Sequence, residues 1–293
     1  DHALGMTLFG YSSRGIEYVE RSHAIRKEME DLSGQGQSLF TYAVVLLADA
    51  RFEDAIEKCR QAMPLLERMG EYYWVHFTRY QLAASLIYLG RHNEGREEAK
   101  RNYLSAKSVG DFQSTGVIMD ILAKGGVDQN FQEWVALEKA RPVTDPQRTN
   151  HVSLGESIDL LEQDRAGDAV ASLESSIDRF EKAEVFNVYT VESYLWLATA
   201  YRVLAEQVSP RAPQLRQRYL DAALASVRKA MWKKYVCKPN LPHLYREYSL
   251  LLTLKGNHHK AERYFRLSLK FAAKLGERYQ VGRTCVEYGK YLV

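Results

Sequence analysis

The side chains that could do chemistry are concentrated in a basic stretch, residues 211–238, where eight lysines and arginines accompany a single acid, Asp221. Apolar residues recur through this stretch at helical spacing, so the charges can occupy the opposite face of a helix. Such a face predicts a contact with nucleic acid, anionic lipid or an acidic domain. The alternative is a solvated surface that offsets acidic charge elsewhere in the chain. The candidate basic patch comprises Arg211, Arg216, Arg218, Arg228, Lys229, Lys233 and Lys234.

Nucleic acid is the least expected of these partners. The stretch lacks a recognition motif and the alternation of aromatic and basic residues that dedicated nucleic-acid readers use. The charge distribution is nevertheless uneven: residues 210–293 carry a net charge of +13 and residues 1–209 carry −10, against +3 for the whole chain. The C-terminal third is therefore the basic part of the protein.

No arrangement typical of an active site or cofactor site occurs in the sequence. The glycines form neither a GxxxxGK[ST] loop nor a GxGxxG turn. His258 and His259 are adjacent, and neighbouring helical positions diverge rather than converge on one metal ion. Cys59, Cys237 and Cys285 are far apart and lack CxxC spacing. We therefore predict no catalytic, cofactor-binding or metal-binding residues, no disulfide, and a reducing, cytoplasmic location.

Targeting signals are equally absent from the sequence. No apolar run reaches the roughly 18 to 20 residues needed to cross a bilayer, so we expect no contact with a membrane interior. The first residues, DHALGMTLFGYSSRG, lack a signal-peptide pattern and resemble the second half of a helix. We expect a fragment of a longer chain.

The elements that carry these residues repeat along the chain. Met69-Gly70-Glu71 and Val109-Gly110-Asp111 lie 40 residues apart, and each places glycine between a hydrophobic residue and an acid. Glycine accepts the left-handed backbone that ends many helices, and the acid suits the positive N-terminus of the next helix. The pattern therefore predicts helix hairpins in series.

The second helix of each hairpin has its own signature. A small residue is followed, four and seven positions later, by residues on the same face, where the partner helix must come close. A degenerate copy is expected over VDQNFQEWVALEKAR, with Trp134 and Leu137 in its core. The six clear sets are Gly15, Val19 and Ser22; Ala55, Cys59 and Ala62; Gly95, Ala99 and Asn102; Ala169, Leu173 and Ser176; Ala223, Val227 and Ala230; Ala261, Phe265 and Ser268.

The whole pattern predicts an all-α protein. No stretch sustains the period of two that a strand requires. We expect one domain over residues 1–293, with about fifteen helices arranged as seven antiparallel pairs and a final helix, Glu277–Leu292. Two prolines make residues 142–150 a predicted loop or hinge, and residues 206–213 are a predicted insertion in one turn.

Two segments, LAASLIYLGRHNEG from Leu82 and YSLLLTLKGNHHKAERYFRLSL from Tyr248, resemble the tetratricopeptide repeat. The longer period, and the tail LGERYQVGRTCVEYGKYLV, are similar to the repeat arrays of bacterial multidomain signalling ATPases and maltose-regulon-type activators. The resemblance implies a right-handed α-solenoid without catalytic activity. It would serve protein–protein interaction, as the scaffold or sensor region of a larger signalling or regulatory protein. The alternative is a regulatory module that binds a small ligand or nucleic acid through its basic third.

Alignment of the repeats places eight residues on the groove side of two first helices. None is the lysine or asparagine with which chaperone-binding members of the family hold a carboxylate, so an apolar groove is predicted. An amphipathic helix or a segment of the same polypeptide would occupy it; the alternative is that these residues only pack against neighbouring hairpins. A homodimer contact is predicted on the final helix, residues 277–292. The groove positions are Gln37, Phe40, Val44, Leu47, Phe77, Tyr80, Ala84 and Ile87.

Overall fold

The structure, a computed structural model, describes residues 2–8, 11–142, 145–185, 190–232 and 238–292. Within these ranges the chain is helical and contains no strand, which confirms the all-α prediction. The described residues belong to two compact units. Unit 1 draws on Asp1–Pro142 and Tyr235–Pro239, and unit 2 on Val143–Lys234 and Asn240–Val293. The boundary after Pro142 falls inside the predicted hinge.

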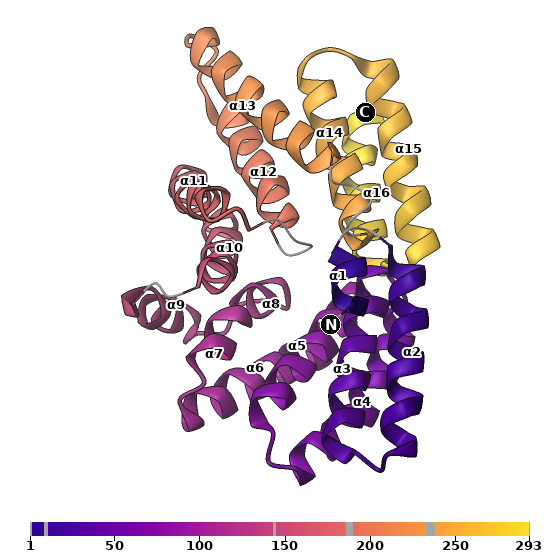
Figure 1. Ribbon diagram of the computed structural model, residues 1–293. Helices are drawn as coiled ribbons and strands as arrows, with labels where there is room; N and C mark the ends of the chain where they lie inside the picture. Colours follow the sequence, from indigo (N-terminus) through magenta and orange to yellow (C-terminus); the bar gives the residue numbers. More distant parts are fainter. Residues whose placement is uncertain (1, 9–10, 143–144, 186–189, 233–237, 293) are drawn as a thin grey trace. The chain divides into compact units, whose positions relative to one another are not determined.

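Unit 1 is a series of helices in which each packs against the next, drawn from indigo to magenta in Figure 1. Its described helices are α1 (His2–Leu8), α2 (Ser12–Glu28), α3 (Leu32–Ala48), α4 (Phe52–Arg68), α5 (Tyr72–Tyr88), α6 (His92–Val109), α7 (Phe112–Val117), α8 (Met119–Lys124) and α9 (Phe131–Ala140). Helix α3 also contacts α1 on one side and α5 on the other. The first helices of successive hairpins therefore form their own packed layer.

The 40-residue repeat has a simple geometric origin. Helices α2, α3, α4 and α5 are each 17 residues long. The turns between them, residues 29–31, 49–51 and 69–71, are equally short. Because the helices and the turns have equal lengths, equivalent positions of successive hairpins lie one helix pair apart in the sequence. The 40-residue repeat follows from that spacing.

The turns that end the helices use the left-handed backbone at equivalent positions. Gly70 and Gly110 have φ of 71° and 74°, as their positions in the repeat predict. Glu30 occupies the same place one repeat earlier and also has a positive φ, 55°, although it carries a side chain. The turn is therefore imposed by the helix packing and is only made easier by glycine.

The predicted small-residue sets are confirmed as helix contacts. All of their members are buried except Ser22, which is partly exposed. A Cβ added at Gly95 would lie 2.6 Å from Ile87 Cγ1 and 3.0 Å from the carbonyl oxygen of Ala83. Helix α6 therefore approaches α5 so closely at this point that a methyl group does not fit without movement.

The degenerate hairpin is present, with one error in its predicted core. Helices α7 and α8 stand in place of a single first helix, and α9 follows as the second. Trp134 is buried and stacks on Tyr103 with ring centroids 4.3 Å apart. Leu137 is 39% exposed, so its prediction as a core residue was wrong. The buried face of α9 follows the helical spacing Phe131, Trp134, Val135 and Glu138, and Leu137 lies off that face.

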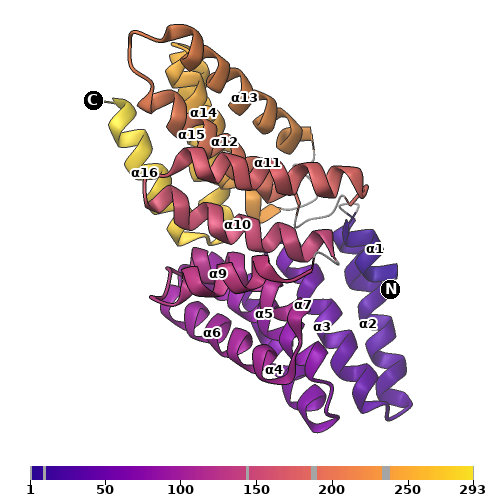
Figure 2. The ribbon, with the colours of Figure 1, turned by 90° about the vertical axis from the view of Figure 1, so that its left-hand side faces the viewer.

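Unit 2 continues with helices of the same kind, again with consecutive helices in contact. Helices α10 and α11 run side by side in the turned view of Figure 2. Its described helices are α10 (Pro146–Glu162), α11 (Ala166–Lys182), α12 (Val191–Gln207), α13 (Pro213–Trp232), α14 (Leu241–Leu254), α15 (His258–Leu275) and α16 (Arg278–Leu292), with a 3₁₀ turn η1 (Lys238–Asn240) before α14.

Three predicted boundaries can be compared with these helices. The insertion at 206–213 is confirmed as a lengthened turn, because α12 ends at Gln207 and α13 begins at Pro213. The loop predicted over 142–150 was wrong for residues 146–150, which form the start of α10. Asp145 caps that helix by accepting hydrogen bonds from the backbone of Gln147 and Arg148, and Pro146 follows at a position where its missing N–H costs nothing. The final helix starts at Arg278 and packs on α14 and α15.

Candidate functional site

The eight predicted groove positions do not form an open apolar surface. Six of them are buried: Phe40, Val44, Leu47, Tyr80, Ala84 and Ile87. Phe77 is partly buried, with its ring centroid 6.4 Å from that of Phe40 and 4.8 Å from that of Tyr73. Gln37 donates a hydrogen bond of 3.0 Å to Glu71 Oε2. The burial matches the alternative that these residues pack against neighbouring hairpins.

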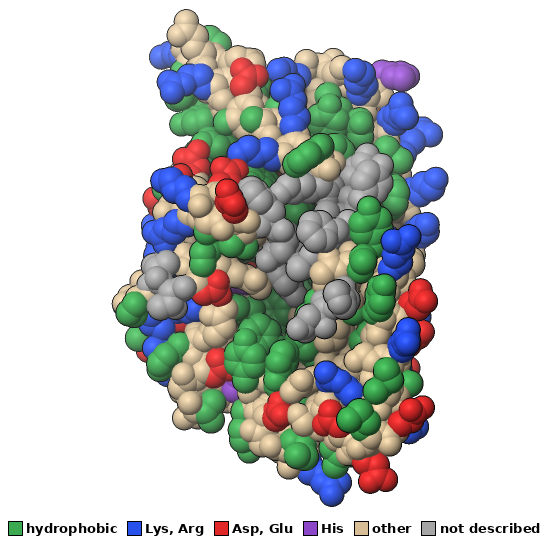
Figure 3. Space-filling model, in the orientation of Figure 1, with side chains coloured by type: hydrophobic (Ala, Val, Ile, Leu, Met, Phe, Trp, Pro, Cys, Tyr) green, Lys and Arg blue, Asp and Glu red, His purple; other side chains and the backbone are tan. Residues whose placement is uncertain are grey.

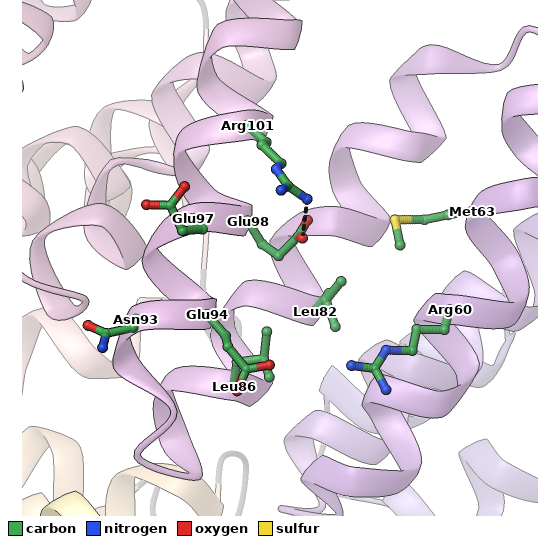
Figure 4. Close-up of a pocket in the computed structure, with 9 residues that line it drawn as sticks. All are labelled: Arg60, Met63, Leu82, Leu86, Asn93, Glu94, Glu97, Glu98 and Arg101. Carbon is green, nitrogen blue, oxygen red and sulfur yellow. Dashed lines mark hydrogen bonds and ion pairs between the residues drawn. The ribbon is translucent and has the colours of Figure 1, made fainter.

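Unit 1 instead has a pocket between α4 and α6, with helix α5 below it (Figure 4). We call it the α4–α6 pocket. Its volume is about 410 Å³, which falls in the range of sites that bind small molecules or side chains. The lining residues are Arg60 and Met63 from α4, Leu82 and Leu86 from α5, and Asn93, Glu94, Glu97, Glu98 and Arg101 from α6.

The floor of the α4–α6 pocket is formed by side chains that belong to the hydrophobic core of unit 1 or pack against it. Leu82 and Leu86 belong to a buried cluster that also contains Ile56 and Cys59, and Met63 packs against it. Met63 is only partly buried, so a flexible thioether faces the opening. Sequence reasoning assigned Leu82 to the repeat and did not see that, with Met63, it lines a pocket.

Most of the charges around the α4–α6 pocket are already paired. Arg91 donates hydrogen bonds of 2.7 Å and 2.6 Å to the two carboxylate oxygens of Glu94, and these bonds hold the pKa of Glu94 below its usual value. Glu98 lies 3.0 Å from Arg101 Nη1 and 3.4 Å from Arg79 Nε. Both acids are therefore engaged by neighbouring arginines.

Two charged side chains of the lining, Arg60 and Glu97, form no hydrogen bond or ion pair with a described residue, although the charge of Arg60 also helps to lower the pKa of Glu94. They differ in direction. In Figure 4 the guanidinium group of Arg60 points across the pocket toward Leu86 and Glu94, whereas the carboxylate of Glu97 is turned away from the apolar floor. Arg60 thus faces the pocket without a hydrogen bond or ion pair to a described residue.

The predicted basic patch lies on helix α13 and on the turn before it. Arg211, Arg218 and Arg228 are exposed, and Arg216 donates a hydrogen bond of 3.4 Å to the carbonyl oxygen of Leu254. Lys229 forms an ion pair of 2.7 Å with Glu181 and lies 5.3 Å from the ring centroid of Tyr194. Lys233 and Lys234 lie outside the described residues.

A second run of basic side chains lies on α15, at the upper right of Figure 3. Sequence reasoning concentrated on residues 211–238 and missed it, although the helical spacing of its members was visible. The exposed members are Lys260, Arg263, Arg266, Lys270 and Lys274. Arg266 pairs with Glu262 at 2.6 Å, so the run is partly neutralised on its own helix.

A buried polar layer crosses α12, α14 and α16 in unit 2. Glu247 accepts hydrogen bonds of 2.5 Å from Arg202 Nε and 3.0 Å from Thr199 Oγ1. Burial alone would lower the pKa of Arg202, but the carboxylates of Glu247 and Glu206 outweigh it and raise that pKa. His243 Nε2 lies 3.1 Å from the same Thr199 hydroxyl. The polar spacing of His243 and Glu247 along α14 was the sequence signal for this layer, and it was missed.

The layer continues to the start of α16 through a second arginine. Arg246 is buried and donates a hydrogen bond of 2.5 Å to Gln280 Oε1. Burial, together with the charge of Arg283, lowers the pKa of Arg246 to about 10. Glu277, the residue before α16, is also buried, and neither of its carboxylate oxygens has a hydrogen-bond partner among the described residues. Burial therefore raises the pKa of Glu277 well above its usual value.

One group of side chains in unit 1 has the residue types of a hydrolase triad. His76 Nε2 lies 3.0 Å from Ser105 Oγ, and His76 Nδ1 lies 2.7 Å from Asp111 Oδ2. Ser105, however, lies near the C-terminal end of α6, where carbonyl groups create a negative potential. An oxyanion needs converging N–H donors, which a helix interior does not offer. The group joins α5, α6 and the start of α7 and has no arrangement for catalysis.

The remaining chemical candidates are not gathered into a site. Among the residues that the structure describes, no three His, Cys, Asp or Glu side chains are grouped to hold a metal ion. Burial raises the pKa of the Cys59 thiol, which sits inside the core of unit 1, and Cys285 is exposed. The ring of His258 lies 5.9 Å from that of Tyr291.

Two comparisons with known proteins found no match. No protein-family model matches the chain, and no curated protein matches it. In the described parts of the chain, none of the helices has the length and apolar character that crossing a membrane requires.

Proposed function

We propose that this chain is a non-catalytic protein–protein interaction module, the scaffold or sensor region of a larger signalling or regulatory protein. The observation that carries this proposal is the α4–α6 pocket: an apolar floor continuous with the core, open between two helices of a hairpin series. Repeated hairpins present such surfaces on rigid elements, which suits recognition of a protein segment. The proposal includes one right-handed, tetratricopeptide-like array, which the sequence resemblance implies, and a cytoplasmic setting, which follows from the cysteine spacing.

The pocket supports a protein segment as ligand because its size and lining match one or two side chains. A floor of Met63, Leu82 and Leu86 offers apolar contact, and the surrounding arginine–glutamate pairs form a polar rim. Interfaces commonly combine an apolar centre with such a rim. The homodimer contact on α16 remains part of the proposal for assembly; there Val286 and Leu292 are exposed.

The test selects ligands for the chain from a phage-displayed library of random linear peptides, then measures their affinity by fluorescence polarisation. Met63→Lys places a charge on the pocket floor and should weaken binding at least tenfold. Met69→Lys is the matched control, because Met69 lies just beyond the same helix, is 47% exposed and does not line the pocket. Circular dichroism establishes that both variants fold. Peptides that bind the folded Met63→Lys variant as well as the original chain would contradict the proposal.

A further inference from the structure

The charge inside the α4–α6 pocket determines what kind of segment can fill it. Two acids of the lining are paired. Glu94 accepts hydrogen bonds from Nε and Nη2 of Arg91, and Glu98 lies between Arg79 and Arg101. A basic ligand would have to displace these arginines to reach Glu94 or Glu98, and the carboxylate of Glu97 is turned away from the floor in Figure 4. The pocket therefore disfavours a positive group near its floor.

Arg60 has the opposite relation to the pocket. It is exposed, forms no hydrogen bond or ion pair with any described residue, and its guanidinium group points over the floor in Figure 4. A guanidinium group binds a carboxylate through two parallel N–H donors, and this geometry selects for a planar anion. An apolar side chain seated on the floor would bring a neighbouring acid of the same segment into its reach.

We propose that the α4–α6 pocket recognises a short acidic–apolar segment of a partner protein, with a leucine, methionine or phenylalanine on the floor and an aspartate or glutamate bound by Arg60. This inference rests on the proposed function and adds the chemistry of the partner. The apolar contact is made with Met63, Leu82 and Leu86, and the carboxylate contact is made with Arg60 alone. The two contacts can therefore be removed separately.

The experiment uses the same library of random linear peptides and sequences the selected clones. Selected peptides should carry an acid within two positions of a large apolar residue. Changing that acid to its amide should weaken binding roughly tenfold, which is the effect expected from losing one charge-assisted contact. Arg60→Gln should cause a similar loss, and on that variant the amide peptide should show no further loss.

Arg68→Gln is the matched control, since Arg68 is an exposed arginine two turns farther along α4 and outside the pocket. It should leave the affinity unchanged. Selection of basic peptides, or equal affinity of the acid and amide peptides, would overturn the inference even if Met63→Lys still abolishes binding. Failure of Met63→Lys to weaken binding would instead overturn the proposed function. The two results are thus distinguishable.

Discussion

His76 and Asp111 form a tie between successive hairpins, with His76 Nδ1 and Asp111 Oδ2 2.7 Å apart. Asp111 is the N-cap of α7, and His76 lies in the first helix of the preceding hairpin. The previous pair of hairpins has the same device, because Glu71, the N-cap of α5, accepts a hydrogen bond from Gln37 in α3. At these two turns the acid that follows the turn therefore reaches back to the hairpin before it.

The charge of Asp111 should stabilise unit 1 above acidic pH. Burial would raise the pKa of Asp111, but hydrogen bonds from His76 and Ser114 outweigh it and lower that pKa. A lowered folded pKa means that this stabilisation is present above the unfolded value of about 4 and is lost as the pH falls through the folded value. Asp111→Asn retains the helix cap and should lower the free energy of unfolding by about 1 to 3 kcal/mol at neutral pH.

Urea unfolding of the original chain and of Asp111→Asn, measured at neutral pH and again below pH 4, checks this expectation. The difference between the two proteins should shrink in acid, because the original carboxylate then becomes protonated. An equal difference at both pH values would show that the charge of Asp111 has no part in the tie.

Ser105 should be chemically inert despite its contact with His76. Its position near the C-terminal end of α6 lacks the N–H donors that would stabilise an oxyanion. We expect no covalent labelling by a fluorophosphonate probe. Mass spectrometry of the treated chain checks this, with a known serine hydrolase as the positive control. A phosphonylated peptide containing Ser105 would contradict the structural assignment.

Glu30 should be a site where glycine increases stability. Glu30 has a φ of 55°, a region that side chains occupy at a cost of roughly 1 kcal/mol. Glu30→Gly should therefore raise the free energy of unfolding by about 1 kcal/mol. Gly70→Ala is the matched control: φ there is 71°, and an added Cβ would have no heavy atom within 4 Å, so the loss of about 1 kcal/mol would come from the backbone alone. Denaturant unfolding curves measure both. The change in the free energy of unfolding should be positive for Glu30→Gly and negative for Gly70→Ala, and equal signs would contradict the prediction.

Glu277 should give unit 2 a pH dependence of the opposite sign to that of Asp111. Burial raises the pKa of Glu277, Arg246 opposes that rise, and Glu192 adds to it. The folded state therefore keeps a proton that the unfolded state releases, so stability declines as the pH rises above the usual value of about 4.3. Glu277→Gln keeps the shape of the side chain and removes this decline. At neutral pH it should be more stable than the original chain by about 1 to 3 kcal/mol.

Thermal unfolding of both proteins from mildly acidic to neutral pH provides the measurement. The two midpoints should converge near pH 4 and separate as the pH rises, with Glu277→Gln the higher. Parallel curves would mean that Glu277 does not titrate in that range.

Much of the fold could be predicted from local patterns. Ala55, Cys59 and Ala62 share one helix face by their spacing, and all three are fully buried. Gly70 and Gly110 mark the turns because a left-handed residue is needed there. Leu137 was misplaced for a related reason: an apolar residue type does not show which side of a short helix faces its partner.

The candidate site depended on distances that no local pattern contains. The groove predicted around Phe40 and Tyr80 is filled, because aromatic side chains from adjacent first helices occupy it. The α4–α6 pocket joins residues from three helices, and Arg60 forms no ion pair there because Glu94 and Glu98 pair with other arginines. Pairing among exposed charges is a result of geometry and could not be read from the charges themselves.

The sequence by itself determined the helices, their hairpin order, the turns and the faces on which they meet, because these follow from the periods of the backbone and from residue size. Only the tertiary structure decided which surfaces stay open, which charges stay unpaired and which acids are buried. Those properties depend on side chains brought together from distant parts of the chain. Gly70 could therefore be predicted from its neighbours, whereas Arg60 could be recognised only from its surroundings in space.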